Sequence, residues 1–227
     1  MTRIAAFLFD MDGLLLDTER LFMKSLITLT DKHGIDPAKA EAFYLDLIGT
    51  SAAETSRQLK RFLPAHIDPL DFENAWRQEY DHVVGQGVPL RPRILETLEA
   101  LKAKGARMAV VTSTYGQSAR AKLKKAGIYG YFEVVKAGDE VSANKPNPAP
   151  YLEAAAALGV SAEDCVAFED SDTGTTAAVA AGCLTFQIPD LRPVGQSLPK
   201  LGQCIAQDLG SAVGQLPDFD AALTTSA

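Results

Sequence analysis

Residues 4–16 read IAAFLFDMDGLLL, an apolar run that stops at two aspartates and a glycine and then resumes. The run is too short to cross a membrane, and its continuous apolar character is typical of a parallel strand buried on both faces. Similar short runs occur at 108–111, 132–135, 165–168 and 184–188, with helical periodicity between them. This alternation predicts an α/β fold in which helices cover a parallel sheet.

The stretch between the first and second runs has a different character. Apolar residues recur at three- and four-residue spacings over 17–31, 37–48, 51–63 and 69–84, with no convincing strand among them. We therefore expect a small all-α cap at residues 15–88, inserted into an α/β core formed by residues 1–14 and 89–227. The aromatic residues expected in the core of this cap are Phe22, Phe43, Tyr44, Phe62, Phe72 and Trp76.

Composition limits the classes of function. The 227 residues are 47% hydrophobic and 22% charged, which is typical of a folded globular chain. The net charge of −7 and the absence of a Lys/Arg run disfavour nucleic acid or an anionic membrane as a partner. No signal peptide or membrane span is recognisable, so a cytoplasmic protein is expected. Cys165, Cys183 and Cys204 are far apart in sequence and are expected to be buried, reduced thiols.

Asp10 and Asp12 follow the first predicted strand, with Gly13 directly after them. A solvated turn can carry the same residues, but here the acids stand between Phe-Leu-Phe and Leu-Leu-Leu. Ligands of open α/β sheets bind at the C-terminal ends of the strands, and a glycine lets the chain curl there. The motif therefore indicates a pair of functional carboxylates.

Two further polar motifs lie farther along the chain. Thr112 and Ser113 belong to VVTST, where hydroxyls and backbone N–H groups ahead of a helix suit a phosphate group. Lys145 belongs to the proline-rich loop NKPNPAP, which would hold it on a stiff arm. Taken singly, the first has an ordinary explanation as a helix cap and the second as a surface charge.

A fourth motif ends the predicted strand 165–168 with Glu169 and Asp170. All four motifs follow inferred parallel strands, so their polar groups are expected to meet at one edge of the sheet. Asp10, Asp12, Glu169 and Asp170 against Lys145 give four negative charges and one positive, or −3, which is costly in a confined site. Oxygen donors without His or Cys favour Mg²⁺, completed by water and a substrate phosphate.

These motifs resemble those of the haloacid dehalogenase superfamily. FLFDMDGLLLDTE resembles its first motif, VVTST its second, Lys145-Pro146 its third, and FEDSDTG with AAVAAG its fourth. The resemblance covers nearly the whole chain. It implies a Rossmann-like core with an α-helical cap inserted after the first motif, in the branch that contains phosphatases and β-phosphoglucomutases.

The resemblance also implies roles for single residues. Asp10 would be the nucleophile that forms an aspartyl-phosphate, and Asp12 the general acid/base. Thr112 and the amide of Ser113 would hold the phosphoryl oxygens, while Lys145 would neutralise charge between Asp10 and the phosphoryl group.

The implied metal site uses other groups of the same motifs. Asp10, Asp170 and the backbone carbonyl of Asp12 would bind Mg²⁺. Glu169 would act through a water or by supporting a ligand, with direct ligation left open.

We therefore expect an Mg²⁺-dependent phosphomonoester hydrolase. The rival is a β-phosphoglucomutase-like isomerase, which carries polar or cationic groups for a second phosphate. Here Phe22, Ile48, Ala52, Tyr115 and Gly116 stand at those positions, which favours hydrolysis.

Two further alternatives concern the motif acids. The dehalogenases of the superfamily lack the second acid, whereas Asp12 is present. A non-catalytic regulator that binds a phosphorylated ligand would be expected to lose one of the motif groups, and all of them are intact.

The resemblance suggests a small sugar phosphate or a nucleoside monophosphate as substrate, including the 2-deoxyglucose-6-phosphate and pseudouridine 5′-phosphate types. A mixed, mostly apolar set of cap residues suits a neutral leaving group of modest size. A monomer is expected. The cap residues proposed to face the substrate are Glu19, Phe22, Met23, Ile48, Gly49 and Thr50.

Overall fold

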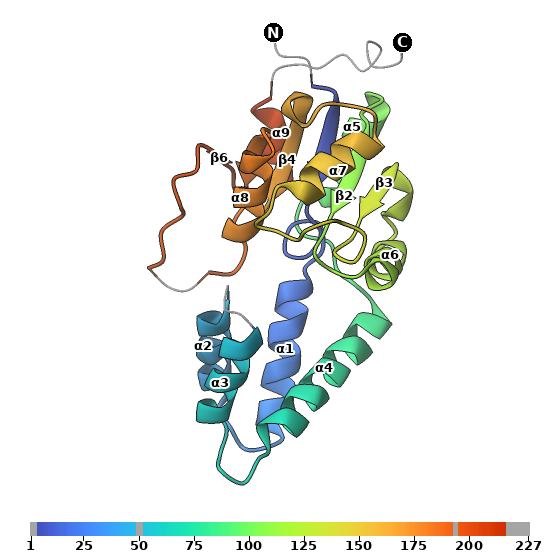
Figure 1. Ribbon diagram of the computed structural model, residues 1–227. Coiled ribbons are helices and arrows are strands. Elements are labelled where there is room, and N and C mark those ends of the chain that lie inside the picture. Colours follow the sequence, from blue (N-terminus) through green and yellow to red (C-terminus); the bar gives the residue numbers. More distant parts are fainter. Residues whose placement is uncertain (1–3, 49–51, 193–194, 217–227) are drawn as a thin grey trace. The chain divides into compact units, whose positions relative to one another are not determined.

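The computed structural model describes residues 4–48, 52–192 and 195–216. Its sheet has six strands, all parallel, in the order β3-β2-β1-β4-β5-β6 (Figure 1). The predicted fold class, a Rossmann-like α/β sheet, is confirmed. The strands are β1 (Ala6–Phe9), β2 (Met108–Val111), β3 (Val134–Lys136), β4 (Cys165–Glu169), β5 (Leu184–Gln187) and β6 (Cys204–Ile205).

Strand β1 lies at the centre of the sheet between β2 and β4, and all four of its residues are buried. Phe9 pairs with Val110 of β2 and with Phe168 of β4. In a parallel sheet the next residue of each strand stays level with its neighbours, so Asp10, Val111 and Glu169 fall side by side. The register alone thus brings two motif acids to one edge.

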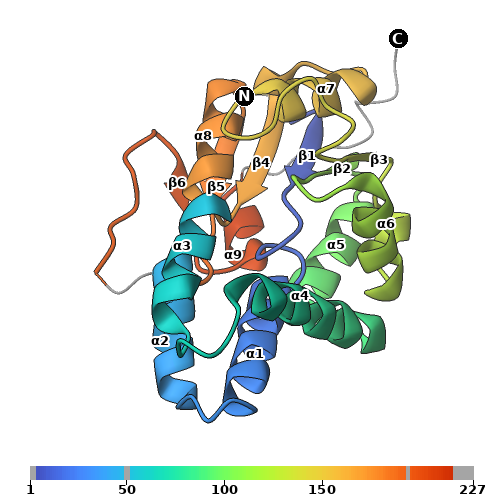
Figure 2. The ribbon, with the colours of Figure 1, turned by 60° about the horizontal axis from the view of Figure 1, so that its bottom comes forward.

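Helices cover both faces of this sheet. Figure 2 shows α7 and α8 on one face and α5 and α9 on the other. Alanines of α7 and α8, among them Ala154 and Ala177, pack directly on the strands, because small side chains let a helix approach a sheet closely. The helices of the core are α5 (Ile94–Ala103), α6 (Gly116–Lys125), α7 (Ala149–Ala157), α8 (Asp172–Ala180) and α9 (Leu209–Gly214), with short 3₁₀ turns at Tyr129–Tyr131 and Ala162–Asp164.

The sequence pattern missed β6 and α9. Strand β6 has only two residues, too few for an apolar period to be visible. Helix α9 has six residues, and its start is fixed by a reciprocal capping box between Asp208 and Ser211. Helix α5 begins at Ile94, directly after Arg93, which adopts a left-handed backbone conformation with φ 63°.

The described residues between β1 and α5 form four helices, α1 (Thr18–Asp31), α2 (Pro37–Leu47), α3 (Ala52–Phe62) and α4 (Pro69–Gln86). Asp36 and Asp68 cap α2 and α4 through their carboxylates, each followed by a proline suited to the first turn. The six aromatic residues expected in its core do pack there: Trp76 and Phe72 are buried, and Phe22 stacks on Trp76 at 4.2 Å between ring centroids.

The chain divides into two compact units, one of residues 18–88 with 191–197 and one of the remainder. Leu191 packs against the core of the helical unit, a contact that no pattern in the sequence predicts. Within the core unit, Arg91 donates toward Asp190 at 3.0 Å and lies 3.7 Å from Asp17. Arg91 therefore joins three points at which the chain leaves or enters the core.

The three cysteines are free. Cys165 and Cys183 are buried as expected, and burial raises the pKa of the first to about 11 and of the second to about 12. Cys204 is only partly buried, because it lies on the short strand β6 at the edge of the sheet, so the expectation of a buried thiol is wrong there.

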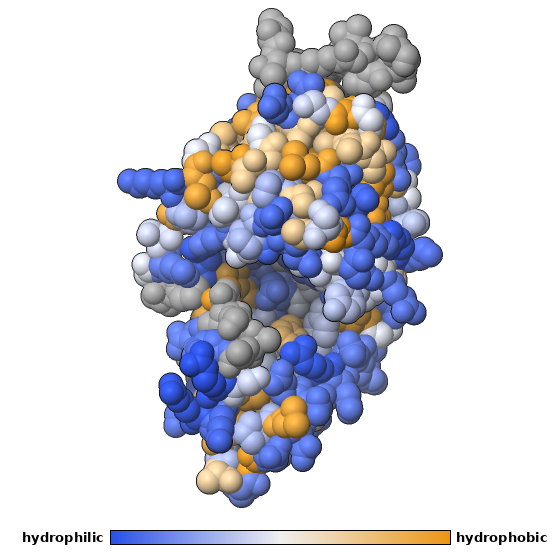
Figure 3. All heavy atoms as spheres, viewed as in Figure 1, coloured by the Kyte–Doolittle hydropathy of each residue, from blue (hydrophilic) through white to orange (hydrophobic). Residues whose placement is uncertain are grey.

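Apolar side chains do not form a large uninterrupted patch on the face shown in Figure 3, where polar residues separate them. The large exposed apolar side chains in the described ranges are scattered: Leu70, Leu95, Tyr115, Leu152, Leu184 and Ile205. No described helix combines the length and the apolar character that a bilayer crossing requires.

Candidate active site

Lys145 is the centre of a buried ionic network at the C-terminal edge of the sheet. Its ammonium donates to Asp10 Oδ1 at 2.5 Å, to Glu169 Oε1 at 2.6 Å and to the carbonyl oxygen of Val111 at 2.8 Å. The side chains of Lys145, Asp10 and Glu169 are 6%, 10% and 0% exposed. Three motifs of the sequence therefore meet at one cation, as their position after strands predicts.

Burial controls the electrostatics of this network. It raises the pKa of Asp10 to about 8, with the Glu169 carboxylate adding to the rise and the Lys145 ammonium opposing it. Burial lowers the pKa of Lys145, but the charges of Asp10 and Glu169 outweigh this and hold the pKa above its usual value. Lys145 is therefore an ammonium ion, and a charged Asp10 needs more positive charge than Lys145 alone provides.

An acidic cluster next to Lys145 has the composition of a metal site. Asp10, Glu169 and Asp170 each offer a carboxylate oxygen, and these oxygens lie within 4.8 Å of one another. Gly13, at φ +85°, leaves the space in which the Asp170 carboxylate lies, since a Cβ at Gly13 would overlap Asp170 Oδ2. An all-oxygen set of this kind fits a hard divalent cation such as Mg²⁺.

Glu169 is held by three side-chain donors. Its Oε1 accepts hydrogen bonds from Lys145 and, at 2.5 Å, from the hydroxyl of Tyr151, while Ser171 donates to Oε2 at 3.3 Å. Gly174 of α8 backs directly onto the carboxylate, where a Cβ would overlap it. Burial, followed by the Glu169 charge, raises the pKa of Tyr151 well above its usual value, so the phenol remains a donor.

Asp12 lies in a more open environment, with 22% of its side chain exposed. Thr114 donates its hydroxyl to Asp12 Oδ2 at 2.7 Å, and Lys122 of α6 donates to Oδ1 at 2.9 Å. Both carboxylate oxygens therefore have a donor. Lys122 adds a positive charge to the sum of four acids and Lys145 that the sequence predicted. The formal charge of these acids and lysines is therefore −2 instead of −3.

Thr112 and Ser113 follow β2 directly, next to the carbonyl that Lys145 binds. The Thr112 side chain is buried, and its Oγ1 accepts the backbone N–H of Thr114 at 3.1 Å. Ser113 is exposed. The hydroxyl-rich turn therefore connects the Lys145 network to Asp12. The carbonyl of Val111, just before the turn, binds Lys145, and the hydroxyl of Thr114 binds Asp12.

The described residues of the helical unit that are proposed to face the substrate make contacts within that unit. Glu19 Oε2 accepts a hydrogen bond from Tyr44 at 2.7 Å, and Phe22 packs in the core of that unit. Met23 and Ile48 also pack against this core. Residues 49 and 50, a glycine and a threonine also proposed to face the substrate, lie outside the described residues.

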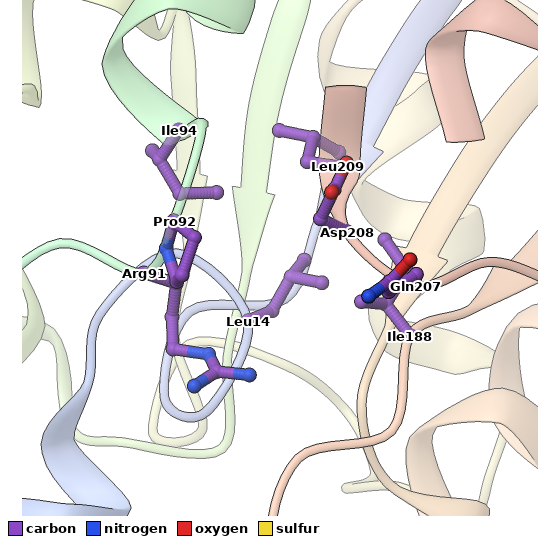
Figure 4. A pocket seen from close by; sticks show the side chains of 8 residues that line it. All are labelled: Leu14, Arg91, Pro92, Ile94, Ile188, Gln207, Asp208 and Leu209. Atoms are coloured by element: carbon purple, nitrogen blue, oxygen red, sulfur yellow. The ribbon is translucent and has the colours of Figure 1, made fainter. Parts of the chain in front are cut away.

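A hollow in the core unit lies beside Leu14, Pro92, Ile188 and Leu209 (Figure 4). It encloses about 130 Å³, well below the roughly 300–1,000 Å³ of pockets that bind small molecules. Its cation, Arg91, is paired with Asp190. This hollow is therefore not the candidate substrate site.

Comparison with known proteins supports the assignment of the four motifs to one family. Residues 7–188 match the family model described as haloacid dehalogenase-like hydrolase. The chain belongs to this family. The match includes all four motifs and the inserted helices, so the resemblance noted in the sequence is confirmed.

Three relatives illustrate the range of this family. Protein CbbY of Rhodobacter capsulatus is 31% identical, over 97% of this chain and 96% of its own. The phosphorylated carbohydrates phosphatase of Thermotoga maritima is 32% identical, over 78% of this chain and 81% of its own. The structure of a haloacid dehalogenase family hydrolase from Deinococcus radiodurans R1, with bound phosphate and sodium, superposes with a TM-score of 0.78 at 26% identity and covers all of both chains.

Sequence reasoning missed Tyr151, Thr114 and Lys122 as parts of the site. The buried positions of α6 are Gly116, Ala119, Lys122 and Leu123, so Lys122 occupies a stripe where an apolar side chain is expected. A lysine at such a position is a signal that could have been found, because a buried lysine requires a partner. Tyr151 carried no comparable signal, since a buried tyrosine is an ordinary core residue.

Proposed function

We propose that this protein is an Mg²⁺-dependent phosphomonoester hydrolase that acts on a small phosphorylated sugar or nucleoside monophosphate. The observation that carries the proposal is the pair of aspartates: Asp10 is buried beside Lys145, and Asp12 is partly exposed beside Thr114. Phosphoryl transfer through a carboxylate needs a fixed nucleophile and a separate proton donor. The two environments fit those two tasks.

In the first step an Asp10 carboxylate oxygen attacks phosphorus, the bond from phosphorus to the leaving oxygen breaks, and Asp12 gives that oxygen its proton. The product alcohol leaves, and Asp10 carries the phosphoryl group as an acyl phosphate. In the second step Asp12 takes a proton from water as the water oxygen attacks phosphorus. Inorganic phosphate departs and Asp10 is restored.

Other groups of the core bear the developing charge. Lys145 lies against Asp10 and is suited to neutralise charge shared with the transferring group. Thr112 and the amide of Ser113 are assigned to the phosphoryl oxygens. Asp10, Asp170 and the carbonyl of Asp12 would hold Mg²⁺, which supplies positive charge for binding the phosphate, while Glu169 is assigned a supporting role because Lys145 and Tyr151 already bind its Oε1.

The proposed substrate class rests on the names of the relatives and on the lack of the polar or cationic side chains with which mutases bind a second phosphate. One relative is named a phosphorylated carbohydrates phosphatase, and others a hexitol phosphatase and a fructose-1-phosphate phosphatase, both of Escherichia coli. Tyr115 and Gly116 follow the hydroxyl-rich turn where mutases carry polar groups, and Tyr115 is largely exposed. Release of phosphate is therefore favoured over its return to the sugar.

The test is release of inorganic phosphate from fructose 1-phosphate, 2-deoxyglucose 6-phosphate, pseudouridine 5′-phosphate and β-glucose 1-phosphate, with Mg²⁺ or with EDTA. We expect Mg²⁺-dependent release that Asp10→Asn abolishes. Conversion of β-glucose 1-phosphate to glucose 6-phosphate without release would instead establish a mutase. Binding of these compounds without turnover would establish the regulator, and release by Asp10→Asn at an appreciable rate would remove the covalent mechanism.

A further inference from the structure

Lys122 is a buried cation outside the four sequence motifs. It lies on α6 with its side chain 10% exposed, and its ammonium donates to Asp12 Oδ1 at 2.9 Å. Placing a lysine in a buried stripe costs free energy through desolvation, and an apolar residue there would pack without this cost. The position of Lys122 is therefore accounted for by the carboxylate that it meets.

The contact also fixes a direction. Lys122 reaches Asp12 Oδ1 while Thr114 reaches Oδ2 at 2.7 Å, so the carboxylate is held from both sides. Rotation about its terminal bond would break both hydrogen bonds. Thr114 is itself tied to the turn that follows β2, because its N–H donates to Thr112 Oγ1.

The two neighbouring lysines of α6 do not share this environment. Lys124 and Lys125 are exposed, and Lys124 lies over the ring of Tyr129 at 5.1 Å from its centroid. Helix α6 thus offers a buried lysine at Asp12 and an exposed lysine two residues away. The second is a matched control for the first.

We propose that Lys122 is a positioning residue for the reaction: with Thr114 it holds the Asp12 carboxylate in the orientation from which Asp12 exchanges protons with the leaving oxygen and with water. This inference rests on the proposed function. Lys122 touches no reacting atom and acts through Asp12. Its loss should therefore lower kcat and leave substrate binding nearly unchanged.

The first measurement is kcat and KM for Lys122→Met, with para-nitrophenyl phosphate and with the fastest of the four phosphates named above. Methionine keeps a long apolar side chain in the buried stripe. We expect kcat to fall by about 10- to 100-fold, the effect of one charge-assisted hydrogen bond, with KM within about twofold of the wild type. Lys124→Met should match the wild type in both constants.

The second measurement separates positioning from a general loss of structure. Asp12→Asn and the double variant Asp12→Asn/Lys122→Met are compared, since residues that act as a unit have non-additive effects. If Lys122 acts through Asp12, Lys122→Met lowers kcat no further in the Asp12→Asn background. An equal further loss in that background overturns the proposal.

The experiment distinguishes a failure of the proposed function from a failure of the role of Lys122. If Lys122→Met does not fold, as judged by circular dichroism, Thr114→Val takes its place in the same cycle, because the two groups are proposed to hold the same carboxylate. If the wild type hydrolyses none of these phosphates, the proposed function fails and the role of Lys122 falls with it. An active wild type with additive effects overturns the role of Lys122 alone.

Discussion

Two aspartates two residues apart in the chain meet two different lysines, and the two pairs have opposite characters. Asp10 and Lys145 lie in a closed network with Glu169, where every side chain is at most 10% exposed. Asp12 and Lys122 lie at its margin, with 22% of Asp12 exposed. A nucleophile benefits from a fixed, dry position, whereas a group that passes protons to an alcohol and takes them from water must be reachable. The contrast in burial therefore matches the contrast in proposed roles.

The largest expected effect is on the closed pair. Lys145→Met leaves Asp10 and Glu169 as adjacent buried carboxylates without their shared cation. Removing one partner of a buried ion pair costs about 3–5 kcal/mol in the free energy of unfolding, and we expect phosphate release to fall by more than about 10³-fold. Urea unfolding and steady-state turnover check both. Retention of a tenth of the activity would contradict the role assigned to Lys145.

On the open pair, activity should suffer far more than stability. Asp12→Asn keeps the size of the side chain, and its partial exposure limits the cost of losing the charge. We expect turnover to fall by about 10²–10⁴-fold, the usual range for a general acid or base, while the unfolding midpoint in urea changes little. Near-normal turnover would refute the acid/base role, and a loss of stability as large as that of Lys145→Met would remove the distinction between the pairs.

Metal binding should distinguish the same two aspartates. Mg²⁺ at 100 times its Kd stabilises a folded protein that binds it by about 2.7 kcal/mol. The Tm of the wild type should therefore rise when Mg²⁺ is added. Asp10→Asn should abolish this rise because it removes a proposed ligand. Asp12→Asn should keep it, since only the backbone carbonyl of Asp12 is assigned to the metal. Equal responses of the two variants would show that the assignment of ligands is wrong.

The smallest effect is expected at the far side of the closed network. Tyr151→Phe removes the hydroxyl that donates to Glu169 Oε1, while Lys145 still binds that oxygen. We expect a loss of about 1–3 kcal/mol in unfolding free energy and a fall in kcat of less than about tenfold. Urea unfolding measured beside turnover tests this order. A fall in kcat comparable to that of Lys145→Met would make Tyr151 a direct participant.

The sequence by itself determined the class of the fold and the edge at which the site lies. Apolar runs such as residues 4–9 mark parallel strands because strand burial follows from local composition, and acids placed after them must lie at the C-terminal edge. Gly13 could also be understood from sequence as the residue that lets the chain curl. Helix starts at Asp36 and Asp68 are likewise local, since a cap bonds to its own first turn.

Only the tertiary structure decided that a second lysine, Lys122, pairs with Asp12. Lys122 lies 110 residues from Asp12 and Lys145 lies 135 residues from Asp10, and no local period relates such positions. The proline-rich loop drew attention to Lys145, while Lys122 stood among other lysines of an ordinary helix. Ion pairing depends on the distance between side chains and on their burial, and both are set by how α6 and the loop pack beside the strands. For this reason the partner of Lys122 became visible only in the folded chain, although its position in the apolar stripe of α6 indicates that it needs one.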